Sequence, residues 1–201
     1  MRRILMAAAL LGGAALTAPA GAQTFRWAND GDVNSMDPYT RQETFLLAFN
    51  SNIYEPLVRR DRRMQVQPAL AESWEQPSPT VWRFHLRRGV KFQDGTPFTA
   101  DDVVFSAGRA RAPGSNIQSV LATVAAIRKV DDHTVEFETR YPNPILPQEL
   151  TILGMMSKAW AEAHNATRPA DLTTREENFA TRNAMGTGPF RLVSREPDRR
   201  T

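Results

Sequence analysis

The chain contains no cysteine, and this absence limits its possible folds because its first residues predict export from the cytoplasm. Arg2 and Arg3 precede an apolar stretch from Ile4 to Leu16, and the Ala-Gly-Ala tripeptide at 20–22 supplies the small residues of a cleavage site. Basic residues, apolar residues and small residues follow one another in this order in secretory signal peptides. An exported chain without disulfides must be held together by its hydrophobic core.

We therefore assign residues 1–22 to a cleaved signal peptide and expect a periplasmic protein. The cysteine that anchors a lipoprotein is missing, so we do not expect a lipoprotein. The paired arginines are compatible with the twin-arginine route, but no polar extension follows them, which favours the general secretory route. The apolar stretch is too short to span a membrane.

The charge of the mature chain is nearly balanced. The formal net charge is +3, and the signal peptide accounts for two of these positive charges. This balance gives no electrostatic argument for nucleic acid or anionic lipid as a partner. Asp61 interrupts the basic run from Arg59 to Arg63, which favours a solvated turn over a binding patch.

Hydrophobic patterning predicts a mixture of helices and strands. The strongest strand is expected over 80–87, where Trp82, Phe84 and Leu86 alternate with polar residues and face the core. Thr99 starts a helix that runs to about Arg111. The other expected elements are helices over 43–54, 145–150 and 158–164, hairpins over 57–68 and 124–139, a turn over 76–79 and strands over 25–28 and 190–193. There is no regular βαβ alternation, so the fold class is mixed α+β or irregular α/β.

We find no catalytic or metal-binding constellation in the sequence. His85, His133 and His164 lack the spacing of metal ligands. Asp101 and Asp102 are better explained as charges at a helix start than as an acid/base pair. The Gly-Thr-Gly sequence at 186–188 resembles a phosphate loop only weakly, because a proline follows it. We therefore expect a protein with no catalytic residues, no metal and no cofactor, whose function is binding.

Five sequence blocks, in matching order and spacing, resemble the bacterial solute-binding protein family 5, the periplasmic dipeptide/oligopeptide-binding components of ABC importers. The blocks are Ile53-Tyr54-Glu55-Pro56-Leu57-Val58, Pro68-Ala69-Leu70-Ala71-Glu72-Ser73-Trp74, Trp82 to Phe92, Asp94 to Ser106, and Gly186-Thr187-Gly188-Pro189-Phe190. They extend over essentially the whole mature chain. Most of them are scaffold residues, so they identify the family better than they locate a ligand.

The resemblance implies a periplasmic-binding-protein-like fold of two lobes, with an extra domain inserted in the first lobe. Residues 23–50 would start the first lobe, residues 51–168 would form the inserted small α+β domain, and residues 169–201 would return to the first lobe. The family domain as a whole would cover about 51–201. The second lobe would be absent, and the strand expected over 190–193 lacks a following partner, so we expect an N-terminal fragment of a longer protein.

The implied function is the capture of di- and oligopeptides in the periplasm for delivery to ABC permease subunits in the inner membrane, by a monomer. Relatives of this family take nickel, haem, sugars or opines instead, and the sequence does not select among these solutes. A secreted hydrolase domain and a chemosensory receptor module remain alternatives. Turnover of chromogenic substrates distinguishes the first, and co-purification with a receptor distinguishes the second.

The resemblance also implies ligand contacts in the loop after Asp37-Pro38. Gln42 is the first candidate, because its amide both donates to and accepts from a peptide backbone. Arg41 is the second, as a partner for a carboxylate. Further candidates in the same stretch are Tyr39, Thr40 and Glu43. The alternative is an ordinary surface loop that leads into a helix.

Overall fold

The computed structural model describes residues 31–196. The helices are α1 (Thr44–Asn50), α2 (Ala100–Arg111), α3 (Leu146–Glu149), α4 (Lys158–Ala163) and α5 (Phe179–Arg182), with 3-10 turns at Gln118–Leu121, Leu150–Ile152 and Leu172–Thr174. The strands are β1 (Val58–Arg60), β2 (Val66–Pro68), β3 (Ala71–Ser78), β4 (Val81–Leu86), β5 (Val124–Asp131) and β6 (Thr134–Thr139). None of the helices between residues 31 and 196 has the length and apolar character of a membrane span.

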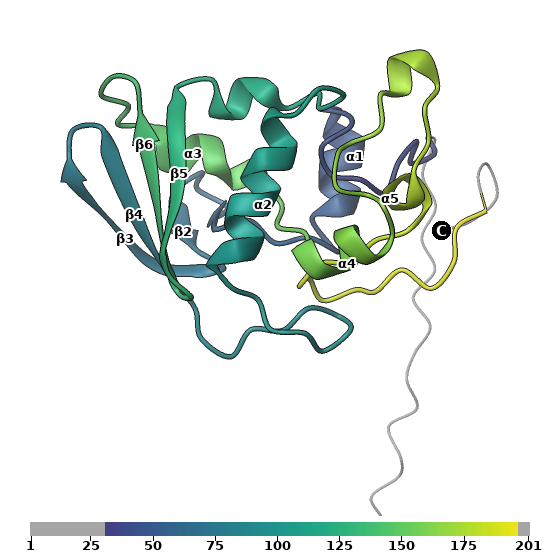
Figure 1. Cartoon of the computed structure of the whole chain (residues 1–201), viewed down its shortest axis with the longest axis horizontal. Coiled ribbons are helices and arrows are strands. Elements are labelled where there is room, and N and C mark those ends of the chain that lie inside the picture. The colour runs from purple at the N-terminus through teal and green to yellow at the C-terminus, as the bar shows by residue number, and fades with distance from the viewer. Residues whose placement is uncertain (1–30, 197–201) are drawn as a thin grey trace, which may run out of the picture. The chain divides into compact units, whose positions relative to one another are not determined.

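The larger sheet is antiparallel, with the strand order β3-β4-β6-β5 (Figure 1). In its centre, β4 pairs with β6 so that Trp82 lies opposite Phe137 and Phe84 lies opposite Val135. The predicted strand over 80–87 and the hairpin over 124–139 are therefore confirmed. A separate two-stranded sheet joins β1 to β2 and confirms the hairpin over 57–68.

The period-two pattern of β4 and β6 decides which face of the sheet is buried. Phe84, Val135 and Phe137 are fully buried, and the rings of Phe84 and Phe137 meet edge to face with centroids 5.6 Å apart. Burying each such side chain stabilises the fold by about 1.5–3 kcal/mol. On the opposite face, Arg83 reaches the Glu136 carboxylate at 2.7 Å, as expected for a solvated cross-strand pair.

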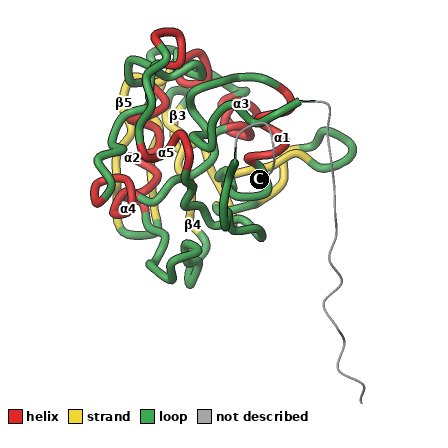
Figure 2. The backbone as a smooth tube through the Cα atoms, turned by 90° about the vertical axis from the view of Figure 1, so that its right-hand side faces the viewer, coloured by secondary structure: helices red, strands yellow, loops and turns green. Residues whose placement is uncertain are grey.

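Helix α2 covers the sheet beside β5 (Figure 1). The backbone N–H of Thr99 donates to the Asp102 carboxylate at 2.9 Å, which confirms the predicted helix start. An apolar stripe then recurs at helical spacing and is completely buried; it consists of Ala100, Val103, Ala107 and Ala110. Seen from the side in Figure 2, α4 and α5 lie in front of α2 and the strands. Helix α2 therefore lies between the larger sheet and a layer formed by α4 and α5.

The Gly-Thr-Gly-Pro sequence at 186–189 is a site of close backbone approach. The N–H of Gly188 donates to the Ile53 carbonyl at 2.8 Å. A Cβ atom at Gly186 would overlap that same carbonyl oxygen, and one at Gly188 would lie 2.6 Å from the Asn52 oxygen. Only glycine permits this contact. The chain here therefore packs on the segment after α1, as a tight turn and not as a phosphate cradle.

Two sequence predictions are wrong. Of the turn expected over 76–79, residues 76–78 belong to β3, which continues to Ser78 as an edge strand and tolerates Pro77 at a register shift, and the turn lies at Pro79 and Thr80. The strand expected over 190–193 does not form in the described chain, where Phe190 and Val193 are 64% and 88% exposed. Alternating residues form a strand only beside a partner, and no neighbouring strand is available to them within residues 31–196. The strand expected over 25–28 lies outside the described residues.

Candidate functional site

The loop that carries the predicted ligand contacts begins at a buried ion pair. The guanidinium of Arg109 donates to both carboxylate oxygens of Asp37, at 3.0 and 2.9 Å, and both side chains are almost completely buried. The same guanidinium donates to the backbone carbonyls of Ala166 and Arg168, at 3.1 and 2.9 Å. Arg109 therefore joins the loop, α2 and the chain after α4 at one point.

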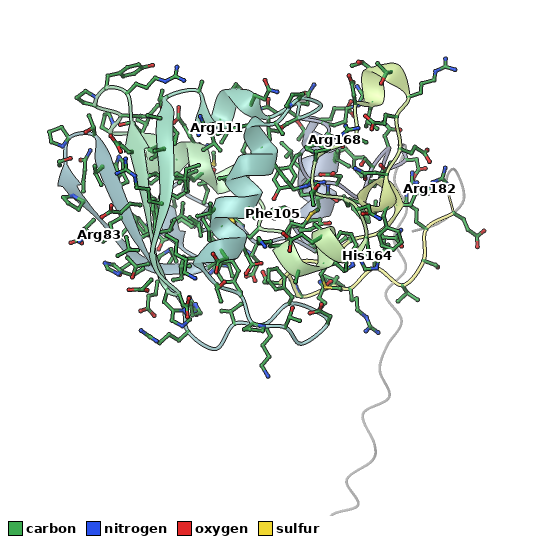
Figure 3. All side chains as sticks on the ribbon, in the orientation of Figure 1. Arg83, Phe105, Arg111, His164, Arg168 and Arg182 are labelled. Atoms are coloured by element: carbon green, nitrogen blue, oxygen red, sulfur yellow. The ribbon has the colours of Figure 1, made fainter. Side chains whose placement is uncertain are left out.

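Arg109 belongs to a second, polar stripe of α2 that the sequence analysis missed. Asp102, Ser106 and Arg109 follow at helical spacing and are buried although they are polar. The Asp102 carboxylate accepts from the N–H of Lys158 at 2.9 Å, and the Ser106 hydroxyl accepts from the N–H of Met156 at 2.9 Å. The stripe faces the layer of α4 and α5; Figure 3 shows Arg168 and His164 on this side of α2. Buried polar groups persist in proteins where they find such partners.

Tyr39 and Thr40 are buried next to this ion pair. The Tyr39 hydroxyl donates to the Gly154 carbonyl at 2.7 Å, and the Arg109 guanidinium lies 5.1 Å from the centre of the Tyr39 ring. Burial raises the pKa of Tyr39, so the hydroxyl remains a donor. The Thr40 hydroxyl donates to the Asp37 carbonyl at 3.1 Å. Both side chains hold the loop in place, and a contact of either with a ligand stays a prediction.

The next three residues reach the surface. Gln42 and Glu43 are exposed and Arg41 is partly exposed. The Arg41 guanidinium lies 3.7 Å from the Glu43 carboxylate, so it already has an acidic partner on the loop. The loop then enters α1 at Thr44. Of the five predicted contacts, Arg41, Gln42 and Glu43 have side chains that a solute reaches without rearrangement of the core.

Gln42 lines a shallow pocket of about 330 Å³. The other lining residues are Arg60, Ser119, Val120, Gln148, Glu149, Thr151 and Ile152. Two carboxamides, two hydroxyls, a guanidinium and a carboxylate surround two aliphatic side chains. Groups of this kind suit a solute that carries amides and charged ends, because closure over such a solute requires a partner for each of its polar groups.

Some of these pocket residues are themselves held in position. The Glu149 carboxylate accepts from the side-chain amide of Asn143 at 2.8 Å, and the Arg60 guanidinium donates to the Gln148 carbonyl at 3.3 Å. Apart from Gln42, the lining residues come from β1, from the turn after α2 and from the α3 region. Sequence analysis found none of them, because only the fold brings these distant segments together.

The histidines considered as metal ligands have ordinary structural contacts. His164 stacks on Phe179 with ring centroids 4.2 Å apart, and its Nδ1 lies 2.8 Å from the Trp160 carbonyl oxygen. His85 lies 3.7 Å from Glu75 on the sheet surface. Between residues 31 and 196, no three histidine, aspartate or glutamate side chains gather closely enough to hold a metal ion.

The chain is similar to known proteins over most of its length. The family model described as bacterial extracellular solute-binding proteins, family 5 Middle, matches residues 65–201. The periplasmic oligopeptide-binding protein OppA of Escherichia coli is 31% identical in an alignment of 166 positions that covers 70% of this chain and 31% of that protein. The chain thus spans about a third of the length of this curated relative.

Solved structures of binding proteins have the same fold over this part. The periplasmic binding protein DppA of Helicobacter pylori, in complex with the peptide STSA, matches with a TM-score of 0.68 and 28% identity, over 82% of this chain and 35% of that one. The binding protein MoaA of A. tumefaciens R10, in complex with mannopinic acid, matches with a TM-score of 0.70 and 31% identity, over 83% of this chain and 33% of that one. The predicted class, a mixed helix and sheet fold of the bilobed binding-protein type present here in part, is thereby confirmed.

Proposed function

Because the chain belongs to family 5 of the bacterial extracellular solute-binding proteins, we propose that it is part of the substrate-binding component of an ABC importer for peptides. In this role it captures di- and oligopeptides in the periplasm and delivers them to the permease subunits in the inner membrane. It acts as a monomer without enzymatic activity, cofactor or nucleic acid. The periplasmic location of relatives such as OppA and the order of residues 1–22 support this location.

The pocket beside Gln42 is the observation that carries the proposal. Its carboxamides at Gln42 and Gln148 both donate and accept, as the repeating amide of a peptide backbone requires. Glu149 offers a carboxylate to an amino group, and Arg60 offers a guanidinium to a carboxyl group. The buried ion pair of Asp37 and Arg109 fixes the loop that presents Gln42. The division into residues 23–50, 51–168 and 169–201 as parts of two lobes stays a prediction.

A second solute class shares this pocket chemistry. MoaA, which is 31% identical to this chain over the matched part, has been solved in complex with mannopinic acid. Arg60 and Arg41 are cations that suit the carboxylate of such a compound. We therefore retain opines as the alternative solute.

Calorimetry on the full-length protein tests the proposal. We expect short peptides to bind and the Gln42→Ala variant to bind them about tenfold more weakly, because a buried hydrogen bond to the peptide is lost. Gln76→Ala is the matched control, since Gln76 lies near the end of β3 outside the pocket and, among residues 31–196, its side-chain amide donates to the Pro79 carbonyl alone. Binding of mannopinic acid without binding of peptides selects the alternative solute. Hydrolysis of a chromogenic ester, glycoside or peptide by the purified protein contradicts the assignment as a receptor.

A further inference from the structure

The hairpin of β1 and β2 carries the densest basic cluster of the described chain. Arg59, Arg60, Arg62 and Arg63 are all exposed, within five consecutive positions. None of the four forms an ion pair with an acid of residues 31–196, whereas the arginines at 83, 128, 168 and 182 all do. The Arg60 guanidinium donates to the Gln148 carbonyl, and the side chains of Arg59, Arg62 and Arg63 have no ion-pair partner in the described chain.

The one acid of the run, Asp61, forms no ion pair with these arginines in the described chain, because amide groups of the turn occupy its carboxylate. One oxygen of Asp61 accepts from the backbone N–H groups of Arg63 and Gln65, at 2.7 and 2.9 Å. The other oxygen accepts from the side-chain amide of Gln67. Asp61 therefore shapes the hairpin turn, and the guanidinium groups point their charge at solvent. The charges of the mature sequence are nearly balanced, but the charges on the surface of this hairpin are not.

An apolar side chain lies at the same turn. Met64 is 63% exposed, between Arg63 and Gln65, and its backbone is left-handed with φ of 61°. This conformation is unfavourable for a residue with a Cβ atom. The hydrogen bonds to Asp61 hold it there, so that the turn presents a flexible thioether among guanidinium groups.

We propose that the hairpin tip, defined as Arg59 and residues 61–64, docks on a membrane surface that carries anionic phospholipids. One guanidinium group donates two parallel hydrogen bonds to the oxygens of a phosphate. Clustered basic residues are also attracted to anionic headgroups. Met64 can enter the boundary between headgroups and acyl chains, so that a membrane meets both the charged and the apolar side chains of the tip. This docking would hold the protein near the membrane independently of any solute in the pocket.

Vesicle co-sedimentation of the full-length protein tests this docking. We expect binding to phosphatidylcholine vesicles that contain phosphatidylglycerol, little binding to pure phosphatidylcholine, and weaker binding as salt is raised. Replacing Arg59, Arg62 and Arg63 by serine should lower the partition coefficient at least about tenfold. Met64→Ser should lower it further at high salt, where only the apolar contact remains. Arg60 is left unchanged because it lines the pocket.

The matched control removes the same charge elsewhere. Arg87, Arg111 and Arg140 are exposed arginines outside the hairpin, and their replacement by serine should leave partition within about twofold of the parent. Circular dichroism verifies that both triple variants are folded. Equal losses in the two variants, equal binding to vesicles with and without phosphatidylglycerol, or no binding to either overturns the proposal. Competition by inorganic phosphate at constant ionic strength would show a free-phosphate site instead. Each of these results leaves the peptide calorimetry unaffected.

Discussion

Asp37 and Arg109 are 72 residues apart in the chain, and their side chains meet through two hydrogen bonds of 3.0 and 2.9 Å in the protein interior. The exposed fractions of the two side chains are 0% and 1%. A charge so far from water is tolerated only with a partner and with its remaining hydrogen-bonding groups satisfied. The carbonyls of Ala166 and Arg168 meet this second condition for Arg109.

Arg109→Met should therefore destabilise the protein by about 3–5 kcal/mol, because it leaves the Asp37 carboxylate buried without its cation. Urea unfolding followed by circular dichroism measures the change in the free energy of unfolding. Arg109→Lys keeps the charge but not the paired geometry, so we expect an intermediate loss.

The double variant Asp37→Asn/Arg109→Met separates the ion pair from simple loss of packing. It should be more stable than the sum of the two single losses predicts, by about 1–3 kcal/mol, because neither charge is then left buried alone. Strict additivity of the two single losses would show that the side chains do not act as a pair.

Asp102 should make stability depend on pH. Burial raises the pKa of this carboxyl above its ordinary value of 3.8, although N–H groups of Lys158 and Thr99 donate to it. The folded protein then holds a proton that the unfolded chain releases near that value, so this contribution to stability is lost as pH rises through the raised pKa. The difference in unfolding free energy between the parent and Asp102→Asn should decline from pH 3.8 upward.

The exposed Asp132 gives a control of opposite sign. Its hydrogen bond to Lys129, at 2.7 Å, lowers the pKa of its carboxyl below 3.8. The stability that it contributes is present above pH 3.8 and is lost as pH falls, so the difference between the parent and Asp132→Asn should grow with pH. Titrations of unfolding that give the same slope for both variants would contradict the assignment.

Gly186→Ala should destabilise the protein by about 1–3 kcal/mol, because the added methyl group meets the rigid Ile53 backbone. Gly108 is the matched control: it is exposed inside α2 and has no atom within 4 Å of an added Cβ. Gly108→Ala should stabilise by up to about 1 kcal/mol through helix propensity. Melting temperatures measured by calorimetry should therefore shift in opposite directions.

Local structure was predictable from the sequence where the pattern of neighbouring residues is enough to define the element. The alternation around Phe84 and the cap at Thr99 depend on neighbours in the sequence, and both elements form as expected. The strand over 190–193 failed because alternation says nothing about whether a partner strand exists. The turn expected over 76–79 lies at Pro79 and Thr80 instead, because the pairing of β3 with β4 extends to Ser78 and an edge strand tolerates Pro77.

The site was far less predictable than the fold. Gln42 was found only through its place after Asp37-Pro38 in the family pattern. The pocket around it depends on Arg60 and Glu149, which no sequence pattern connects. The sequence analysis did not single out Arg109, because it looked for apolar stripes on helices. The stripe that contains Arg109 is polar, although it is buried as deeply as the apolar one.

Asn143 is the most informative position to change near the pocket, since it is 5% exposed and its side chain makes three hydrogen bonds. Its amide nitrogen donates to Glu149 and Thr123, at 2.8 and 2.9 Å, and its oxygen accepts from the N–H of Ile145 at 3.1 Å. Asn143→Ala should cost about 2 kcal/mol of stability.

Asn143→Ala should also release the Glu149 carboxylate into the pocket and weaken solute binding. The hydrogen bond that the Trp82 indole N–H donates to the backbone carbonyl of residue 143, at 2.9 Å, survives the change. The control is Asn183→Ala, which should cost less than about 0.5 kcal/mol, because within residues 31–196 the Asn183 side chain donates to the Phe179 carbonyl at a helix end and to no other group. Urea unfolding and solute calorimetry on both variants measure the two effects. If Asn143→Ala lowers stability but leaves affinity equal to that of the Asn183 control, then the position of Glu149 does not matter to the bound solute, and the pocket beside Gln42 is not where the solute lies.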